Sequence, residues 1–125
     1  MQANAGKRPV VLVVEDEILV RMDAIDAIEA AGFDVIDVSD ADEAIAILER
    51  RNDIHLIFTD IQMPGSMDGL KLAHFVKNRW PPIKIIATSG YAKITEKDLP
   101  EGARFLPKPY AAAEIARTIE QLIRL

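Results

Sequence analysis

The sequence contains no cysteine and no long apolar run. Without cysteine the chain has no disulfide, no thiolate chemistry and no cysteine-ligated metal site, which is compatible with a cytoplasmic location. Because no stretch of about 18 consecutive apolar residues occurs, we expect no transmembrane helix and no membrane partner. The N-terminus lacks the apolar segment of a signal peptide, and we expect residues 1–8 to form a disordered arm.

An excess of positive charge is also missing, since the formal net charge is −5 at pH 7. A nucleic-acid partner is therefore not expected. The chain has 125 residues, of which 50% are hydrophobic. This length suits one domain, expected over residues 9–125, and the apolar content is sufficient for a hydrophobic core.

Five short apolar runs bounded by turn residues predict five strands. They cover residues 10–14, 33–38, 54–59, 83–88 and 104–106. Between them, apolar residues recur at three- and four-residue steps, which predicts helices. These cover residues 17–31, 39–51, a third from 68 to a stop before residue 81, a short segment at 95–99, and 111 to the end.

Two of these helices carry more specific expectations. In the first helix the periodic residues that should face the core are Ile18, Met22, Ile25 and Ile28. In the second helix, Ser39 has the side chain of an N-cap.

Strand and helix alternate along the whole chain, which indicates a parallel sheet with helices on both faces. Right-handed crossovers leave few topologies for such a chain. We predict a flavodoxin-like, doubly wound α/β fold with five strands in the order 2-1-3-4-5. The switch point of that order, between strands one and three, is where such folds place ligands.

Acidic residues follow the two strands that flank this switch point. Glu15 and Asp16 come directly after the first strand, and Asp60 directly after the third. Each alone has an ordinary explanation, because acidic residues commonly stabilise turns. Together, three converging carboxylates repel one another and raise each other's pKa values unless a cation neutralises them. Their oxygen ligands suit a hard ion, and we expect Mg²⁺, with Mn²⁺ as an alternative.

Further polar side chains follow the last two strands. Ser89 offers a hydroxyl at the end of the fourth strand, and Lys108 an ammonium at the end of the fifth. A hydroxyl, an ammonium and a divalent cation together form a clamp for phosphoryl oxygens. An aspartate that faces such a clamp, here Asp60, can act as a nucleophile and form an aspartyl phosphate.

Four stretches of the sequence resemble one known family. They are Val13-Val14-Glu15-Asp16, Phe58-Thr59-Asp60 with Met63-Pro64 and Asp68-Gly69, Thr88-Ser89-Gly90, and Phe105-Leu106-Pro107-Lys108-Pro109-Tyr110. Together they are similar to the receiver domain of the two-component response regulator family, in its stand-alone, single-domain form. The resemblance covers nearly the whole chain.

The resemblance implies a role for each residue of the acidic site. Asp60 would be the phosphoacceptor, and Lys108 would bind the phosphoryl group. Glu15 and Asp16 would hold Mg²⁺ together with Asp60 and the backbone carbonyl of Gln62. The resemblance also implies a cis peptide between Lys108 and Pro109.

It further implies a conformational switch. Ser89 would be the switch hydroxyl, with Thr88 as the alternative. Phe105, with Tyr91 as its neighbour, would change exposure when this hydroxyl moves, although packing in the core explains Phe105 equally well. Two departures from the family pattern stand out. The loop at residues 65–67 is one residue longer, and the fourth helix is short.

By this resemblance the chain is a phosphorylation-dependent signalling switch and not a metabolic enzyme. Its donor would be a sensor histidine kinase or a histidine phosphotransfer protein, and its own activity would be limited to self-phosphorylation and weak autodephosphorylation. We expect a monomer or a weak homodimer, either stand-alone or part of a larger protein. The alternatives are a Mg²⁺-dependent phosphohydrolase and another flavodoxin-like binding module. Gln62 stands where such a hydrolase typically carries a second acid.

Overall fold

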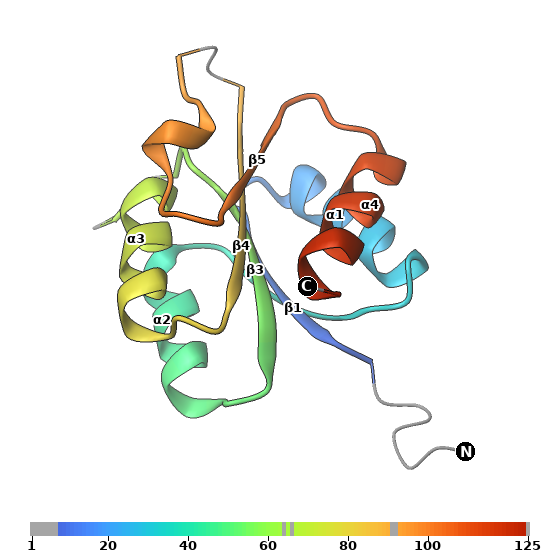
Figure 1. Cartoon of the computed structure of the whole chain (residues 1–125). Helices are drawn as coiled ribbons and strands as arrows, with labels where there is room; N and C mark the ends of the chain where they lie inside the picture. Colours follow the sequence, from blue (N-terminus) through green and yellow to red (C-terminus); the bar gives the residue numbers. More distant parts are fainter. Residues whose placement is uncertain (1–7, 64, 66, 91–92, 125) are drawn as a thin grey trace.

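A five-stranded parallel sheet forms the centre of the computed structural model, which describes residues 8–63, 65, 67–90 and 93–124 (Figure 1). The strands are β1 (Val10–Val14), β2 (Asp34–Val38), β3 (Ile54–Asp60), β4 (Lys84–Ser89) and β5 (Arg104–Pro107). They lie in the order β2-β1-β3-β4-β5 and all pairs are parallel, which confirms the predicted topology.

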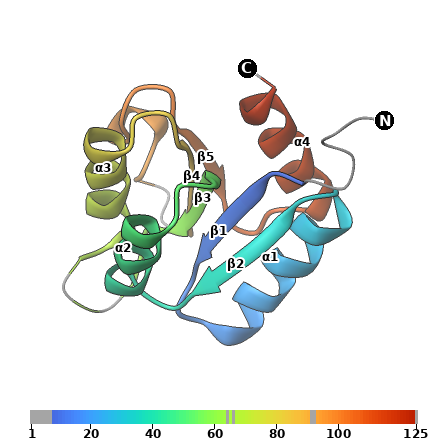
Figure 2. The same cartoon turned by 90° about the horizontal axis from the view of Figure 1, so that it is seen from below.

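Helices cover both faces of this sheet, as Figure 2 shows. They are α1 (Ile18–Ala30), α2 (Ala41–Arg50), α3 (Gly69–Arg79) and α4 (Ala112–Ile123), with one 3-10 turn, η1 (Glu96–Asp98), before β5. Helices α2 and α3 pack on one face, and α1 and α4 on the other. Within the described part of the chain no helix is both long and apolar enough to cross a membrane.

The hydrophobic core consists of two layers, because successive residues of a strand point to opposite faces. In β3, Ile57 packs in the layer beneath α2 and α3, and its neighbour Phe58 in the layer beneath α1 and α4. In β4, Ala87 belongs to the first layer and Ile86 to the second. This alternation decides which side chains share a face at the carboxyl ends of the strands.

The predicted inner face of the first helix is wrong at its N-terminal end. Ile28 is fully buried as expected, but Ile18 is 60% and Met22 51% exposed. Leu19, at 74%, is exposed beside them, and the second buried residue of α1 is Ala24. The buried residues of α1 lie in its second half, and the apolar residues of its N-terminal part face outward.

The predicted cap of the second helix is shifted by one residue. Asp40, not Ser39, is the N-cap, and its side chain accepts a hydrogen bond from the backbone N–H of Glu43. Ser39 instead donates from its N–H and its hydroxyl to the carboxylate of Glu43. Both acidic side chains therefore satisfy donors at the start of α2.

Two stretches singled out in the sequence lie at the edges of the described residues. Residue 66 of the lengthened loop is outside them, and α3 begins at Gly69 behind its N-cap Asp68. At the N-terminus, residues 1–7 of the expected arm are also outside them. Arg8 donates hydrogen bonds to the carbonyl oxygens of Gly32 and Glu29.

Candidate functional site

Three carboxylates meet at the carboxyl edge of the sheet. Asp60 is the last residue of β3, and Glu15 and Asp16 follow β1, which pairs with β3. One oxygen from each carboxylate lies within 4.8 Å of the others. Glu15 and Asp60 are each only 4% exposed, whereas Asp16 is exposed. The fold thus brings together residues that are 45 positions apart in sequence.

A lysine reaches into this cluster from the end of β5. The Lys108 Nζ lies 3.2 Å from Oε1 of Glu15 and 3.4 Å from Oδ1 of Asp60. The backbone N–H of Lys108 donates to the carbonyl oxygen of Ser89, which ties this residue to the end of β4. The following peptide bond, to Pro109, is cis, as the resemblance implies.

Burial and charge shift the proton affinities of these groups. Burial raises the pKa of Asp60, although Lys108 and the backbone N–H of Gln62 act in the opposite direction. Burial also raises the pKa of Glu15, against the effects of the Glu17 N–H and Lys108. For Lys108 burial lowers the pKa, but Asp60 and Glu15 outweigh it, so the pKa of Lys108 is raised. One ammonium therefore does not fully compensate the buried negative charge.

The donor set fits a small hard cation. Three carboxylates on one side of an open site offer oxygen ligands and leave positions for water or phosphoryl oxygens, which is the environment that Mg²⁺ prefers. Oδ1 of Asp60 is buried, and among the described residues it has no partner with full hydrogen-bond geometry, although the Lys108 Nζ lies 3.4 Å away. The residues present can therefore hold a divalent ion that the lysine alone does not replace.

The two hydroxyls at the end of β4 have different surroundings. Ser89 donates to Oε1 of Gln62 at 3.2 Å. Ser89 follows Ala87 at a spacing of two, and Ala87 pairs in register with Phe105, so Ser89 is on the face of the sheet that carries Phe105. Thr88 is on the opposite face and pairs in register with Asp60. Of the two, Ser89 is the hydroxyl that shares a face with the aromatic ring.

Phe105 is half-buried and packs against the core layer beneath α2 and α3. Its backbone N–H donates to Oε2 of Glu96 in η1, which also pairs with Arg104. The backbone at Phe105 is thus tied to η1, the short turn that stands where the fourth helix was expected to be short. Tyr91, its expected neighbour, lies outside the described residues.

Two residues that support the site were not assigned a role from the sequence. A Cβ on Gly69 would come within 1.9 Å of the carbonyl oxygen of Asp60, so only glycine fits beside the end of β3. The Asp68-Gly69 pair in the sequence signals this position. Arg21 donates to the carbonyl oxygen of Glu15 at 2.9 Å and pairs with Asp37, and no motif points to it.

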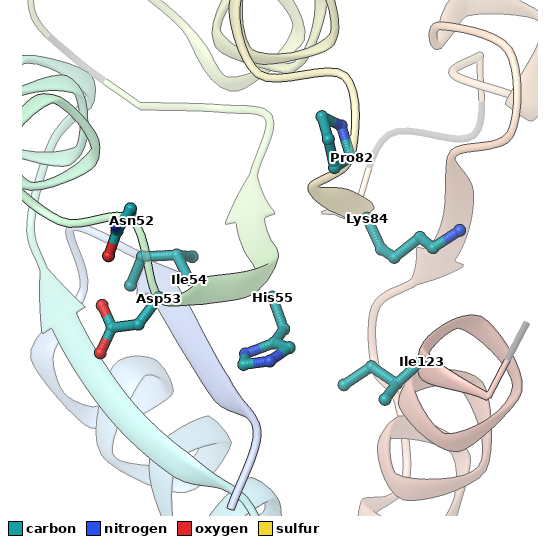
Figure 3. A pocket seen from close by; sticks show the side chains of 7 residues that line it. All are labelled: Asn52, Asp53, Ile54, His55, Pro82, Lys84 and Ile123. Carbon is teal, nitrogen blue, oxygen red and sulfur yellow. The ribbon is translucent and has the colours of Figure 1, made fainter.

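A hollow of about 300 Å³ at the opposite edge of the sheet contains none of these groups (Figure 3). It is lined by Asn52, Asp53, Ile54, His55, Pro82, Lys84 and Ile123. His55 accepts a hydrogen bond from the backbone N–H of Val10 through Nδ1, where the β1–β3 register shifts. The imidazole thus satisfies a backbone N–H that the irregular strand pairing leaves free, which is a structural role.

A family model described as the response regulator receiver domain matches residues 11–120. The chain belongs to this family. A receiver domain is typically a signalling module and not a catalyst, and receiver domains bind Mg²⁺ through an acidic pocket such as the one formed by Glu15, Asp16 and Asp60.

Curated relatives and solved structures agree with this membership. The receiver is 30% identical over 116 residues to the response regulator receiver protein CpdR of Brucella abortus, covering 90% of this chain and 95% of CpdR. It is 35% identical over 117 residues to the sensor kinase CckA of the same organism, of which it spans 12%. A response regulator receiver protein from Sinorhizobium medicae superposes with a TM-score of 0.87 at 26% identity, covering 94% of this chain and 96% of that one.

Proposed function

We propose that this receiver is a phosphorylation-dependent switch of a two-component phosphorelay and that Asp60 is its phosphoacceptor. One observation carries the proposal. Asp60 is a buried carboxylate held between Lys108 and the acidic pair Glu15–Asp16, and one of its oxygens has no well-aligned hydrogen-bond donor among the described residues. A carboxylate of this kind is available as a nucleophile.

In the proposed reaction an oxygen of Asp60 attacks the phosphorus of a phosphohistidine. The new P–O bond forms as the P–N bond breaks, and the electron pair of that bond remains on the imidazole nitrogen. The Lys108 ammonium, 3.4 Å from Asp60, faces the incoming phosphoryl oxygens. A Mg²⁺ ion held by Glu15, Asp16, Asp60 and the backbone carbonyl of Gln62, with Mn²⁺ as a substitute, would neutralise charge on those oxygens.

The donor in this proposal is a sensor histidine kinase or a histidine phosphotransfer protein. The exposed apolar residues Ile18, Leu19 and Met22 lie in the N-terminal part of α1, which begins two residues after Asp16. A hollow of about 440 Å³ between α1 and the end of β5 is lined in part by Val20 and Lys108. An apolar patch beside a reacting carboxylate suits a partner helix that presents its histidine to Asp60.

The proposed output runs through Ser89 and Phe105. A phosphoryl group on Asp60 adds negative oxygens beside Lys108, and the Ser89 hydroxyl can leave Gln62 to donate to one of them. Movement at the end of β4 would then free space for the Phe105 ring, with Tyr91 as the second aromatic. The surface of η1, β5 and α4 would change as a result. Such a change requires different contacts in the two states.

Labelling of an aspartate variant tests the phosphoacceptor directly. Asp60→Asn should take no acid-labile, hydroxylamine-sensitive label from acetyl phosphate with Mg²⁺, because the amide is not a nucleophile for this step. Asp53→Asn is the matched control, since that aspartate pairs with Arg51 at the opposite edge of the sheet. It should label like the wild type. Full labelling of Asp60→Asn would show that another residue accepts the phosphoryl group.

A further inference from the structure

Two buried side-chain oxygens lack a hydrogen-bond partner within the part of the chain that the structure describes. They are Oδ1 of Asp60 and Oγ1 of Thr88. Thr88 is only 1% exposed, so solvent does not satisfy its hydroxyl. A buried polar group without a partner destabilises the folded state, because it has lost its hydrogen bonds to water. Buried polar groups are nearly always hydrogen-bonded, so an exception calls for an explanation.

These two oxygens belong to residues that lie next to each other on adjacent strands. Thr88 of β4 pairs in register with Asp60 of β3, and paired residues of parallel strands project to the same face of a sheet. Strands in this arrangement are about 4.8 Å apart, which is within reach of a hydroxyl and a carboxylate. The hydrogen bond from the N–H of Ile61 to the carbonyl oxygen of Thr88, at 2.9 Å, fixes this pairing at the end of both strands. A change of the Thr88 χ1 angle between staggered rotamers moves Oγ1 without moving the backbone.

Packing alone does not account for a threonine at this position. The two residues that precede it in β4, Ile86 and Ala87, are buried and apolar. Valine has the same shape, favours strands equally and carries no hydroxyl that burial would penalise. The hydroxyl is therefore the property that distinguishes Thr88. Ser89 does not share this property, because its hydroxyl already donates to Gln62 from the other face of the sheet.

We propose that Thr88 is a positioning residue for the phosphoacceptor, whose hydroxyl donates a hydrogen bond to Oδ1 of Asp60. The inference rests on the proposed function and adds a second hydroxyl to it, separate from the switch hydroxyl. Lys108 holds the carboxylate from one side at 3.4 Å. A donor on the adjacent strand fixes the plane of the carboxylate, so that its attacking oxygen is oriented before the donor arrives.

Two substitutions separate the hydroxyl from the methyl group. Thr88→Val keeps the shape and removes the hydroxyl, whereas Thr88→Ser keeps the hydroxyl and removes the methyl. We expect the maximal rate of labelling by acetyl phosphate at saturating Mg²⁺ to fall about tenfold in Thr88→Val, a factor that corresponds to about 1.4 kcal/mol. Thr88→Ser should remain within about twofold of the wild type. The KM for acetyl phosphate should change little in either variant, because Thr88 orients Asp60 and does not touch the donor.

Thermal stability should follow the opposite order, which rules out misfolding as the cause. Thr88→Val loses the hydrogen bond to Asp60 but also a buried hydroxyl, so it should melt close to the wild-type temperature, and Thr88→Ser should melt below it because it leaves a small cavity. A Thr88→Val protein that labels at the wild-type rate would overturn the positioning role and leave the phosphoacceptor proposal standing. If Thr88→Ser is labelled slowly and Thr88→Val at the wild-type rate, Thr88 acts through packing, and the positioning role is also overturned. A wild-type chain without label would overturn both proposals.

Discussion

Replacement of Asp60 by asparagine should stabilise the metal-free protein at neutral pH. Asp60 is 4% exposed, and the carboxylates of Glu15 and Asp16 have oxygens within 4.8 Å of it. At an effective dielectric constant of about 20, a like-charge pair at that distance costs about 3.5 kcal/mol. The attraction to Lys108 at 3.4 Å is worth about 5 kcal/mol on the same scale.

The combined repulsion from Glu15 and Asp16 nearly cancels the attraction to Lys108. It is less than twice the value for one pair, because exposed Asp16 is screened by solvent and repels Asp60 less than buried Glu15 does. Burial of the Asp60 charge then decides the sign, in agreement with its raised pKa. Lys108 keeps Glu15 as a partner at 3.2 Å in the variant, so the substitution leaves no unpaired buried cation. We expect Asp60→Asn to raise the free energy of unfolding by about 1–2 kcal/mol, or the melting temperature by roughly 3–10 °C.

The increase in the free energy of unfolding caused by Asp60→Asn should depend on pH in a defined direction. The folded-state pKa of Asp60 lies above the unfolded value of about 4, so between the two the folded wild type binds more protons than the unfolded chain. Wild-type stability therefore falls as pH rises through this window, and the full deficit is present above the folded pKa. The advantage of Asp60→Asn should be largest at neutral pH and should disappear as pH falls through the folded pKa towards 4.

Thermal or urea unfolding in buffer with a chelator, at several pH values from 4 to 8, measures this difference. Asp53→Asn is the control, because hydrogen bonds from Arg51 lower the pKa of exposed Asp53 and its loss should not stabilise the protein. A loss of stability in Asp60→Asn at neutral pH would refute the reasoning. So would a gain of the same size at pH 4 and pH 7, since protonation would then play no part in it.

Four further outcomes follow from the same geometry. Saturating Mg²⁺ should stabilise the wild type by about 1–3 kcal/mol in thermal unfolding and Asp60→Asn by much less, and an equal shift in both would contradict a three-carboxylate site. Gly69→Ala should cost about 1–3 kcal/mol in urea unfolding, because its Cβ has no room beside Asp60, and wild-type stability would disprove this contact. Ser89→Ala should keep beryllofluoride binding but reduce the amide NMR shifts near Phe105, and undiminished shifts would place the coupling elsewhere. Leu19→Asn should slow phosphotransfer from a histidine phosphotransfer protein but not from acetyl phosphate, and equal effects on both donors would exclude a docking role.

The sheet and its polar edge follow from local features of the sequence. β1 is apolar throughout and is followed by Glu15, and the apolar run Leu56-Ile57-Phe58 of β3 leads through Thr59 to Asp60, so strand ends and site residues coincide. Alternation of strand and helix then fixes the strand order, because few right-handed topologies remain. The distinction between Thr88 and Ser89 needed the structure. Side-chain direction at the end of β4 depends on its register with β3 and β5, which residue spacing does not specify.

The contact of Gly69 with Asp60 and the position of Arg21 could also be found only from the structure. Gly69 reads in the sequence as the start of a helix, and only the path of the chain after β3 brings it against the Asp60 carbonyl oxygen. Arg21 lies on α1, and its bond to the carbonyl oxygen of Glu15 depends on how the β1–α1 connection turns. Gly69 and Arg21 do not belong to the pattern of apolar residues, so hydrophobic periodicity does not predict their contacts with the backbone of Asp60 and Glu15.

The misassigned face of α1 has a physical cause. Hydrophobic periodicity indicates which face of a helix is apolar, but it does not distinguish burial within the chain from burial against a partner. Ala24 and Ile28, in the part of α1 that packs on the sheet, are buried by the chain itself. Ile18, Leu19 and Met22 lie in the N-terminal part of α1, where the described part of the chain leaves them exposed. Periodicity therefore assigns Ile18 and Met22 to the core, although the described part of the chain does not cover them, and burial by the proposed phosphodonor would account for the same apolar pattern.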